Sequence, residues 1–163
     1  NYPVVNNLII ATCVAVYLME LAAPGGMGQF IHRYGLVPAR LHPFAFLSFM
    51  FMHGGFWHLI SNMWILYIFG DNIEDHLGSA RYLMFYLLCG LISGVAHILL
   101  HSGSPEVPVV GASGAIAGVM GAYMLLSPHA KVLTLIPLIF IPFFFEFTLI
   151  PVFSIFQKIH GLN

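Results

Sequence analysis

The sequence predicts an all-α, polytopic transmembrane helical bundle, and three observations indicate it. Charged residues make up 7% of the 163 residues, against about a quarter in soluble domains. Hydrophobic residues make up 60%, which is too apolar for a soluble surface and for a disordered chain. The charges also separate apolar stretches close to the roughly 20 residues that a helix needs to cross a bilayer. The bilayer is therefore the expected solvent.

The net charge and the cysteines argue against further classes of protein. A formal net charge of -1 gives no basic surface for nucleic acid, so we expect no nucleic-acid partner. Cys13 and Cys89 lie in separate apolar stretches without a CxxC partner, so neither a disulfide framework nor a zinc site is indicated. No Lys or Arg precedes the first apolar stretch, and we interpret it as a retained helix rather than a signal peptide.

The first predicted segment runs from about residue 4 to residue 21. A Pro-Gly-Gly breaker at residues 24–26 follows it, which indicates a helix stop. The long stretch 25–43 then carries Arg33 and Arg40 and is too polar to span a bilayer. We expect this loop to lie in the membrane interface.

The second and third segments differ in what bounds them. A glycine pair at residues 54–55 divides the second segment into a non-helical lead-in and a helix from about Phe56. Three acidic residues are expected to end that helix: Asp71, Glu74 and Asp75. The third segment, 82–100, carries small residues on adjoining turns, which are Gly90, Ser93, Gly94 and Ala96. Such residues are expected where helices pack closely in lipid.

The fourth segment, 113–126, is too short to span the membrane. As a helix it extends about 21 Å, against a hydrocarbon core of about 30 Å. We expect it to start below the membrane surface, after a loop that faces a water-filled cavity. Three glycines repeat on one face of it, namely Gly114, Gly118 and Gly121. This repeat predicts a central helix that its neighbours pack against closely.

The fifth segment is predicted to be a helix from residue 131 to about residue 157. Pro137, Pro142 and Pro151 interrupt it, so kinks are expected. No internal repeat or low-complexity tract divides the chain, and residues 1–163 are predicted to form a single membrane domain. Orientation is not predicted, because the basic residues fall on both sides of the membrane.

Ser113 is the first candidate catalytic residue. It lies in Gly111-Ala112-Ser113-Gly114, where glycines allow a tight turn and leave the hydroxyl uncrowded at a helix N-terminus. Free backbone N–H groups and the positive end of the helix dipole favour an oxyanion there. Alone the motif is weak, because a lone G-x-S-G also fits a plain N-cap before a packing helix.

The second constellation is HGGFWHLISN at residues 53–62. Within it His58 and Asn62 are four residues apart and share a helix face. An imidazole and an amide at membrane depth are functional candidates, because burying them in lipid is costly. The alternative is a polar pair that holds helices together. A metal site is disfavoured, since no acidic residue or cysteine lies within a turn of either histidine.

Together, the GxSG at the start of a short fourth helix and the His-x4-His-x3-Asn on the second resemble the rhomboid family of intramembrane serine proteases. The resemblance extends over nearly the whole chain to Glu146. It includes YGLVP at residues 34–38, HGGFWHLISNMW, GDNIED at residues 70–75 and GASGAIAGVMGAY. Two independent motifs in the family's order make the resemblance specific.

The resemblance implies roles for these residues. Ser113 matches the nucleophile, and His58 and Asn62 match the side chains that line the oxyanion hole beside the Ser113 N–H. Other matching positions are expected to be structural, and they are His53, Glu74, Gly111, Gly114 and Gly118. The resembling enzymes cut single-pass membrane proteins near the membrane surface and use no metal or organic cofactor.

The expected partners and location follow from the same resemblance. We expect transmembrane protein substrates and the lipid bilayer as partners. The protein is expected to be an integral multi-pass protein of the bacterial inner (plasma) membrane. Its oligomeric state and its particular substrates stay open.

The resemblance also implies a catalytic histidine on a sixth helix, in an Ala-His-x-x-Gly setting. The 163 residues end just after the fifth segment, so we expect a domain truncated at its C-terminus. His160-Gly161 is a weak substitute, because no apolar helix surrounds it. Without a base Ser113 keeps its proton and stays a weak nucleophile.

Three interpretations follow. One is a serine endopeptidase whose base lies outside these residues, and another is an inactive pseudoprotease that binds membrane helices. The third, a small transporter or channel subunit, depends only on the Gly-rich fourth segment and on polar residues at depth.

Overall fold

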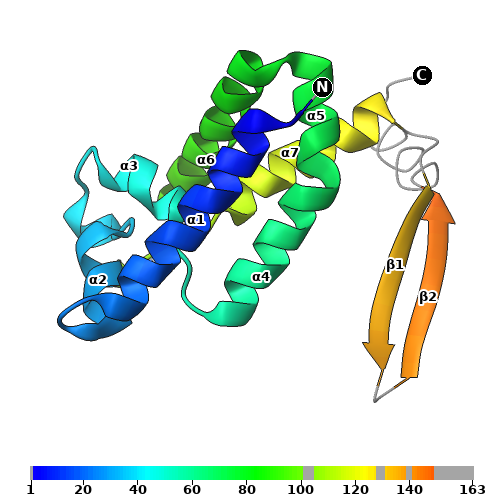
Figure 1. The fold of residues 1–163 in the computed structure, drawn as a ribbon. Coiled ribbons are helices and arrows are strands. Elements are labelled where there is room, and N and C mark those ends of the chain that lie inside the picture. The colour runs from blue at the N-terminus through cyan, green and yellow to red at the C-terminus, as the bar shows by residue number, and fades with distance from the viewer. Residues whose placement is uncertain (1, 101–104, 128–130, 139–140, 149–163) are drawn as a thin grey trace. The chain divides into compact units, whose positions relative to one another are not determined.

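A computed structural model describes residues 2–100, 105–127, 131–138 and 141–148, with the backbone alone in the last two ranges. The chain divides into two compact units, Asn1–Met120 and Gly121–Asn163. The first unit is helical (Figure 1), with α1 (Val4–Ala22), α2 (Gly26–Tyr34), α3 (Ala45–Ser48), α4 (Phe56–Ile65), α5 (Asp71–Leu77), α6 (Ser79–Leu100) and the start of α7 (Ser113–Leu126). Single turns lie between them, at η1 (Pro38–Arg40), η2 (Phe49–Phe51) and η3 (Leu66–Gly70). The prediction of an all-α bundle is confirmed for this unit.

Helices α1 and α6 are each long and apolar enough to cross a membrane. Only 28% of the apolar stretch of α1 and 17% of the apolar stretch of α6 are buried inside the protein. Large apolar side chains stand on their surfaces, with Leu18 60% and Ile92 66% exposed. A core helix of a soluble protein is mostly buried, so these surfaces indicate contact with lipid. The predicted first, third and fourth segments correspond to α1, α6 and α7, within three residues at each end.

The acidic residues do not end the second helical segment, and that prediction was wrong. Helix α4 continues through the π-helical turn η3 into α5 and ends at Leu77. The stop is Gly78, which has a φ of +77° and donates its N–H to the Glu74 carbonyl over 2.8 Å. Glycine adopts this left-handed conformation without the strain that a side chain would bring.

Glu74 stays inside the helix because α1 and α6 provide its partners. Its carboxylate accepts the backbone N–H groups of Val5 at 3.0 Å and Asn6 at 2.7 Å. It also accepts the Ser79 hydroxyl at 2.6 Å. The first N–H groups of a helix have no partner within the helix, so Glu74 satisfies the N-terminus of α1 with a charge of the favourable sign.

Asn6 extends this network to the π-helical turn. Its side-chain amide donates to the Leu66 carbonyl over 3.0 Å, and its carbonyl oxygen accepts the Tyr82 hydroxyl at 2.7 Å. A Cβ added at Gly70 would collide with Asn6 and come within 2.7 Å of the Tyr82 hydroxyl oxygen. The start of α1, η3 and α6 are therefore packed closely at one end of the bundle.

Small residues give the contacts of α6 that the sequence predicted. Two glycines of α6 and two of α7 each face a side chain so closely that an added Cβ would force a shift. The pairs are Gly90 with Met50, Gly94 with Phe49, Gly114 with Ser93, and Gly118 with Cys89. Gly114 and Gly118 thus confirm the predicted close packing of α7, and the contact at Gly121, which belongs to the second unit, stays a prediction.

The described part of the fifth segment forms strands and not a helix, which corrects the sequence prediction there. In the second unit β1 (Lys131–Leu138) and β2 (Ile141–Thr148) pair antiparallel, with Lys131 opposite Thr148 and Pro137 opposite Pro142. Proline removes a helical hydrogen bond and clashes with the preceding turn. The β-branched and aromatic residues between the prolines favour strands. Residues 149–163, including Pro151 and His160, lie outside the described part.

Candidate active site

Ser113 is the first residue of α7, and backbone hydrogen bonds hold the loop before it. Leu36 and Val109 exchange two N–H to carbonyl bonds of 3.1 and 2.8 Å. The N–H of Gly111 donates to the Phe49 carbonyl over 2.8 Å. The loop is therefore fixed from two sides, by the chain after α2 and by η2. This fixes the backbone that leads to Ser113, whose side chain is exposed.

Gly111 brings the two sequence motifs together. Its φ is +128°, a conformation that side chains rarely adopt. A Cβ built there would lie 2.9 Å from both Cε1 and Nε2 of His58 and 3.8 Å from Oγ of Ser113. The His58 imidazole and the Ser113 hydroxyl thus both lie within 4 Å of one point beside Gly111. Any residue larger than glycine would displace the imidazole.

His58 and Asn62 lie on α4, which begins at Phe56 after extended backbone at Gly55. His58 is half-buried, and Asn62 is 6% exposed. The Nδ2 amide of Asn62 has no hydrogen-bond partner within the described residues. The Ser61 hydroxyl donates to the His58 backbone carbonyl over 3.1 Å and not to the His58 imidazole. Asn62 therefore has an unused amide donor one helical turn from His58.

His53 lies behind this pair and is fully buried. Its ring packs edge-on against that of His58, with 5.2 Å between centroids and 67° between planes. Neither ring nitrogen has a partner in the part of the chain that the structure describes. Burial, and then the neighbouring His58, lower the pKa of His53 to about 4. The ring is neutral at pH 7 and supports His58 by packing.

Glu20 is a residue of this region that the sequence analysis missed. It is fully buried near the end of α1. Its carboxylate accepts the backbone N–H of His53, at 3.1 Å to Oε1 and 3.4 Å to Oε2. A signal was present in the sequence, because a lone carboxylate within an apolar spanning segment is a candidate by default. Glu20 thereby fixes the lead-in to α4.

The arrangement contains some of the groups that an acyl-transfer reaction needs. It provides a hydroxyl at a helix N-terminus, where backbone N–H groups are free, and nearby amide and imidazole donors that can stabilise an oxyanion. Ser113 Oγ makes no hydrogen bond to a described residue. Among the described residues no group of three or more His, Cys, Asp or Glu could hold a metal ion. His97 lies on α6, and His101 and His160 fall outside the described ranges.

The fold and the site define a polytopic helical membrane protein with a serine at the N-terminus of a short helix, beside a histidine from a second helix. The family model for the Rhomboid domain matches residues 40–161. This match covers more than half of the chain, which therefore belongs to the rhomboid family.

Three relatives illustrate the range of the family. Rhomboid protein 1, mitochondrial, of Saccharomyces cerevisiae is 37% identical over 51% of this chain and 25% of its own length. The putative rhomboid protease YdcA of Bacillus subtilis is 29% identical over 76% of this chain and 62% of its own length. The presenilin-associated rhomboid-like protein, mitochondrial, of Bos taurus is 32% identical over 58% of this chain and 24% of its own length. The chain thus spans from about a quarter to less than two thirds of these relatives.

Proposed function

We propose that this protein is an intramembrane serine endopeptidase that cleaves transmembrane-segment substrates near the membrane surface. The observation that carries the proposal is the approach of the His58 imidazole and the Ser113 hydroxyl to one point beside Gly111. Membership of the rhomboid family supports it, as does the name of the Bacillus relative, a putative rhomboid protease.

The proposed reaction is acyl transfer through Ser113. A general base takes the hydroxyl proton while Oγ attacks the scissile carbonyl carbon, and the carbonyl oxygen becomes an oxyanion. The Ser113 N–H, His58 and Asn62 donate hydrogen bonds to that oxyanion. The base returns the proton to the leaving amine as the peptide bond breaks, and water then hydrolyses the acyl-enzyme. The family resemblance assigns the base to a histidine on a sixth helix.

The proposed function also implies a class of substrate and a membrane. Substrates are membrane-spanning proteins that reach Ser113 from the lipid, and no metal or organic cofactor takes part. We propose a bacterial plasma membrane as the location, supported by the longer match to the Bacillus protein than to the mitochondrial relatives. Those mitochondrial relatives make an organelle membrane the alternative.

The test is cleavage of a membrane-spanning reporter by the full-length protein in liposomes. Wild type and Ser61→Ala are expected to release the same fragment, and Ser113→Ala to release none. Ser61 is the matched control, because it is an exposed serine beside the same site. Equal cleavage by Ser113→Ala would contradict the proposal.

The alternative is a pseudoprotease that binds membrane helices without cutting them. It applies if no base activates Ser113, because an unassisted serine is a weak nucleophile. A helical client that the wild-type protein retains uncut would support this alternative, and turnover that depends on Ser113 would exclude it.

A further inference from the structure

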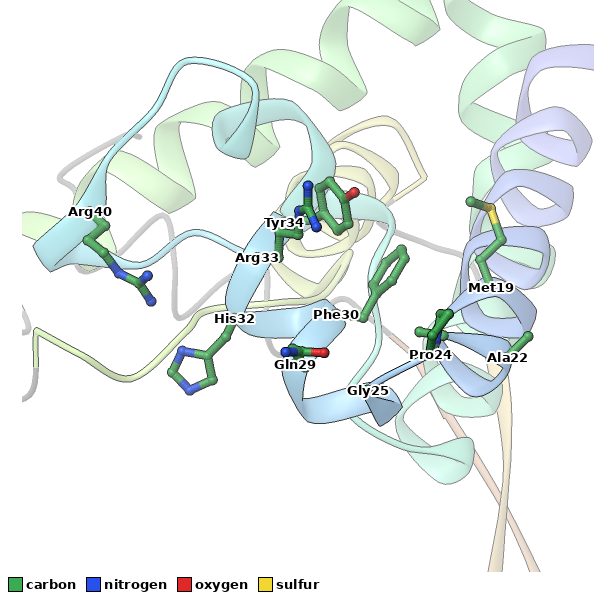
Figure 2. A pocket seen from close by; sticks show the side chains of 11 residues that line it. Met19, Ala22, Pro24, Gly25, Gln29, Phe30, His32, Arg33, Tyr34 and Arg40 are labelled. Atoms are coloured by element: carbon green, nitrogen blue, oxygen red, sulfur yellow. The ribbon is translucent and has the colours of Figure 1, made fainter.

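A basic cavity lies beside the end of α1, away from Ser113. It is open to the surface, has a volume of about 730 Å³ and is lined by the end of α1, the turn after it, α2 and η1. Figure 2 shows the ring of Phe30 directed from α2 toward α1, where Met19 lies on the facing helix. The cavity thus joins an apolar spanning helix to the loop that follows it.

The charges of this cavity are all of one sign. Arg33, Arg40 and His32 line it, together with the amide of Gln29, and no Asp or Glu is among its lining residues. The Arg33 guanidinium carbon lies 5.5 Å from the centroid of the Tyr34 ring, an arrangement that orients the charge. Two guanidinium groups without a lining carboxylate favour an anion, and their planar forks suit phosphate oxygens.

A second, apolar cavity of about 370 Å³ shares three residues of this wall. Met19, Phe30 and Tyr34 line both cavities, and the remaining lining of the second is largely aliphatic and aromatic. Both aliphatic hydroxyl groups that line the second cavity are already hydrogen-bonded to backbone carbonyls. Thr12 donates to the Leu8 carbonyl over 2.7 Å, and Ser48 donates to the Tyr34 carbonyl over 2.5 Å. A basic cavity therefore adjoins an apolar one.

The location suits the boundary between headgroups and acyl chains. Helix α2 is amphipathic, with Met27, Phe30, Ile31 and Tyr34 at helical spacing on one face. It follows a spanning helix whose last turns expose Leu18 and Leu21 by 60% and 57%. Amphipathic helices of this kind lie in the membrane interface. A ligand at this site would have its charged part in the basic cavity and its apolar part in the adjoining one.

We propose that the two cavities bind one anionic phospholipid. Its phosphate lies in the basic cavity that Arg33 and Arg40 line, and one acyl chain lies in the apolar cavity beyond Met19, Phe30 and Tyr34. A free phosphate would use only the basic cavity, and a zwitterionic lipid would gain little from the uncompensated positive charge. The site is distinct from Ser113 and its test does not depend on peptidase activity.

The first experiment is native mass spectrometry of the purified protein with phosphatidylglycerol and phosphatidylcholine of identical acyl chains. Wild type is expected to retain one phosphatidylglycerol in preference to phosphatidylcholine. The double variant Arg33→Gln/Arg40→Gln is expected to lose this lipid by about 30-fold, from the usual contribution of two basic residues near an anionic membrane surface. Arg81→Gln, which removes an exposed arginine outside the cavity, is expected to retain it.

A second arm separates a lipid from a free anion. Dihexanoyl phosphatidylglycerol is expected to bind more weakly than the dioleoyl form, and millimolar inorganic phosphate is expected not to displace the lipid. Equal retention by the double variant and Arg81→Gln would overturn the proposal, as would displacement by phosphate. If the double variant does not fold, Arg40→Gln alone is used, with a loss of about fivefold expected.

Discussion

A buried carboxylate lies near each end of α1, and the two have different surroundings. Glu74 of α5 lies at its start, and Glu20 of α1 itself lies near its end. Glu74 accepts two backbone N–H groups and a hydroxyl at 2.6 to 3.0 Å, so its end of the bundle is well satisfied. Glu20 accepts the N–H of His53 at 3.1 and 3.4 Å, beside a site with unused polar groups. The Glu74 end is therefore fully hydrogen-bonded, whereas the Glu20 end adjoins the candidate site with its unpaired polar groups.

The distribution of unpaired polar atoms shows the same difference. In the described part of the chain, four buried side-chain nitrogen or oxygen atoms lack a hydrogen-bond partner. Three belong to His53 and Asn62, and the fourth is the Tyr86 hydroxyl. Buried polar atoms without partners cost free energy. Three of the four thus lie on α4 or just before it, on the same stretch as His58.

The largest expected effect is on stability at the Glu74 end. Glu74→Ala leaves the N–H groups of Val5 and Asn6 without their acceptor, and we expect it to lower the free energy of unfolding by about 4 kcal/mol. Thermal unfolding in detergent measures this change, with the exposed Glu106→Ala as control. An unchanged melting temperature in Glu74→Ala would show that α1 does not depend on this carboxylate.

The next effect is on the site. Gly111→Ala forces a side chain into the left-handed conformation and against His58, and we expect Ser113 reactivity to fall about 100-fold. Gly54→Ala is the matched control, because its Cβ would meet only Val110 Cγ2 at 3.9 Å. The rate of labelling by a fluorophosphonate probe measures both. Equal rates in the two variants would count against the approach of His58 and Ser113.

A smaller effect is expected at Glu20. Glu20→Leu leaves the buried N–H of His53 without an acceptor and should cost about 2 kcal/mol, with a loss of Ser113 labelling at temperatures where the protein stays folded. Glu20→Gln keeps a carbonyl oxygen as acceptor and should restore most of the labelling. If both variants labelled as wild type, Glu20 would have no positioning role.

The smallest effect concerns His53 and depends on pH. Its pKa is about 4 when folded, below the ordinary value of 6.5, so the unfolded chain binds more protons between these pH values. Stability from this group is therefore lost as pH falls from 6.5 toward 4. His53→Phe should match wild type at pH 7 within about 1 kcal/mol and lose less stability on acidification. Parallel pH profiles of the two proteins would contradict the buried neutral imidazole.

The sequence predicted the helices well where composition decides them. Apolar stretches bounded by breakers placed α1, α6 and α7 closely, and the glycine pair placed the start of α4 at Phe56. It failed at the acidic residues, because a carboxylate at a predicted helix end can pair with another helix, as Glu74 does. It failed in the described part of the fifth segment, where Pro137 and Pro142 were interpreted as kinks in a helix but lie opposite each other on two paired strands.

The candidate site was predictable in its residue types and not in its geometry. Spacing places His58 and Asn62 on one helix face, yet no local pattern reveals that Gly111 has a φ of +128° and contacts the His58 ring. The contact of Glu20 with His53 joins residues 33 positions apart, and such pairs depend on tertiary packing. The basic cavity likewise depends on how α2 folds back beside α1.

The most direct test of the account is labelling of the full-length protein by a fluorophosphonate, read by intact mass spectrometry. The account predicts one adduct on wild type and on Ser61→Ala, at Ser113, and none on Ser113→Ala. Wild type without an adduct would contradict an activated serine at the start of α7 and would favour the pseudoprotease. An adduct that persists in Ser113→Ala would contradict the assignment of the nucleophile.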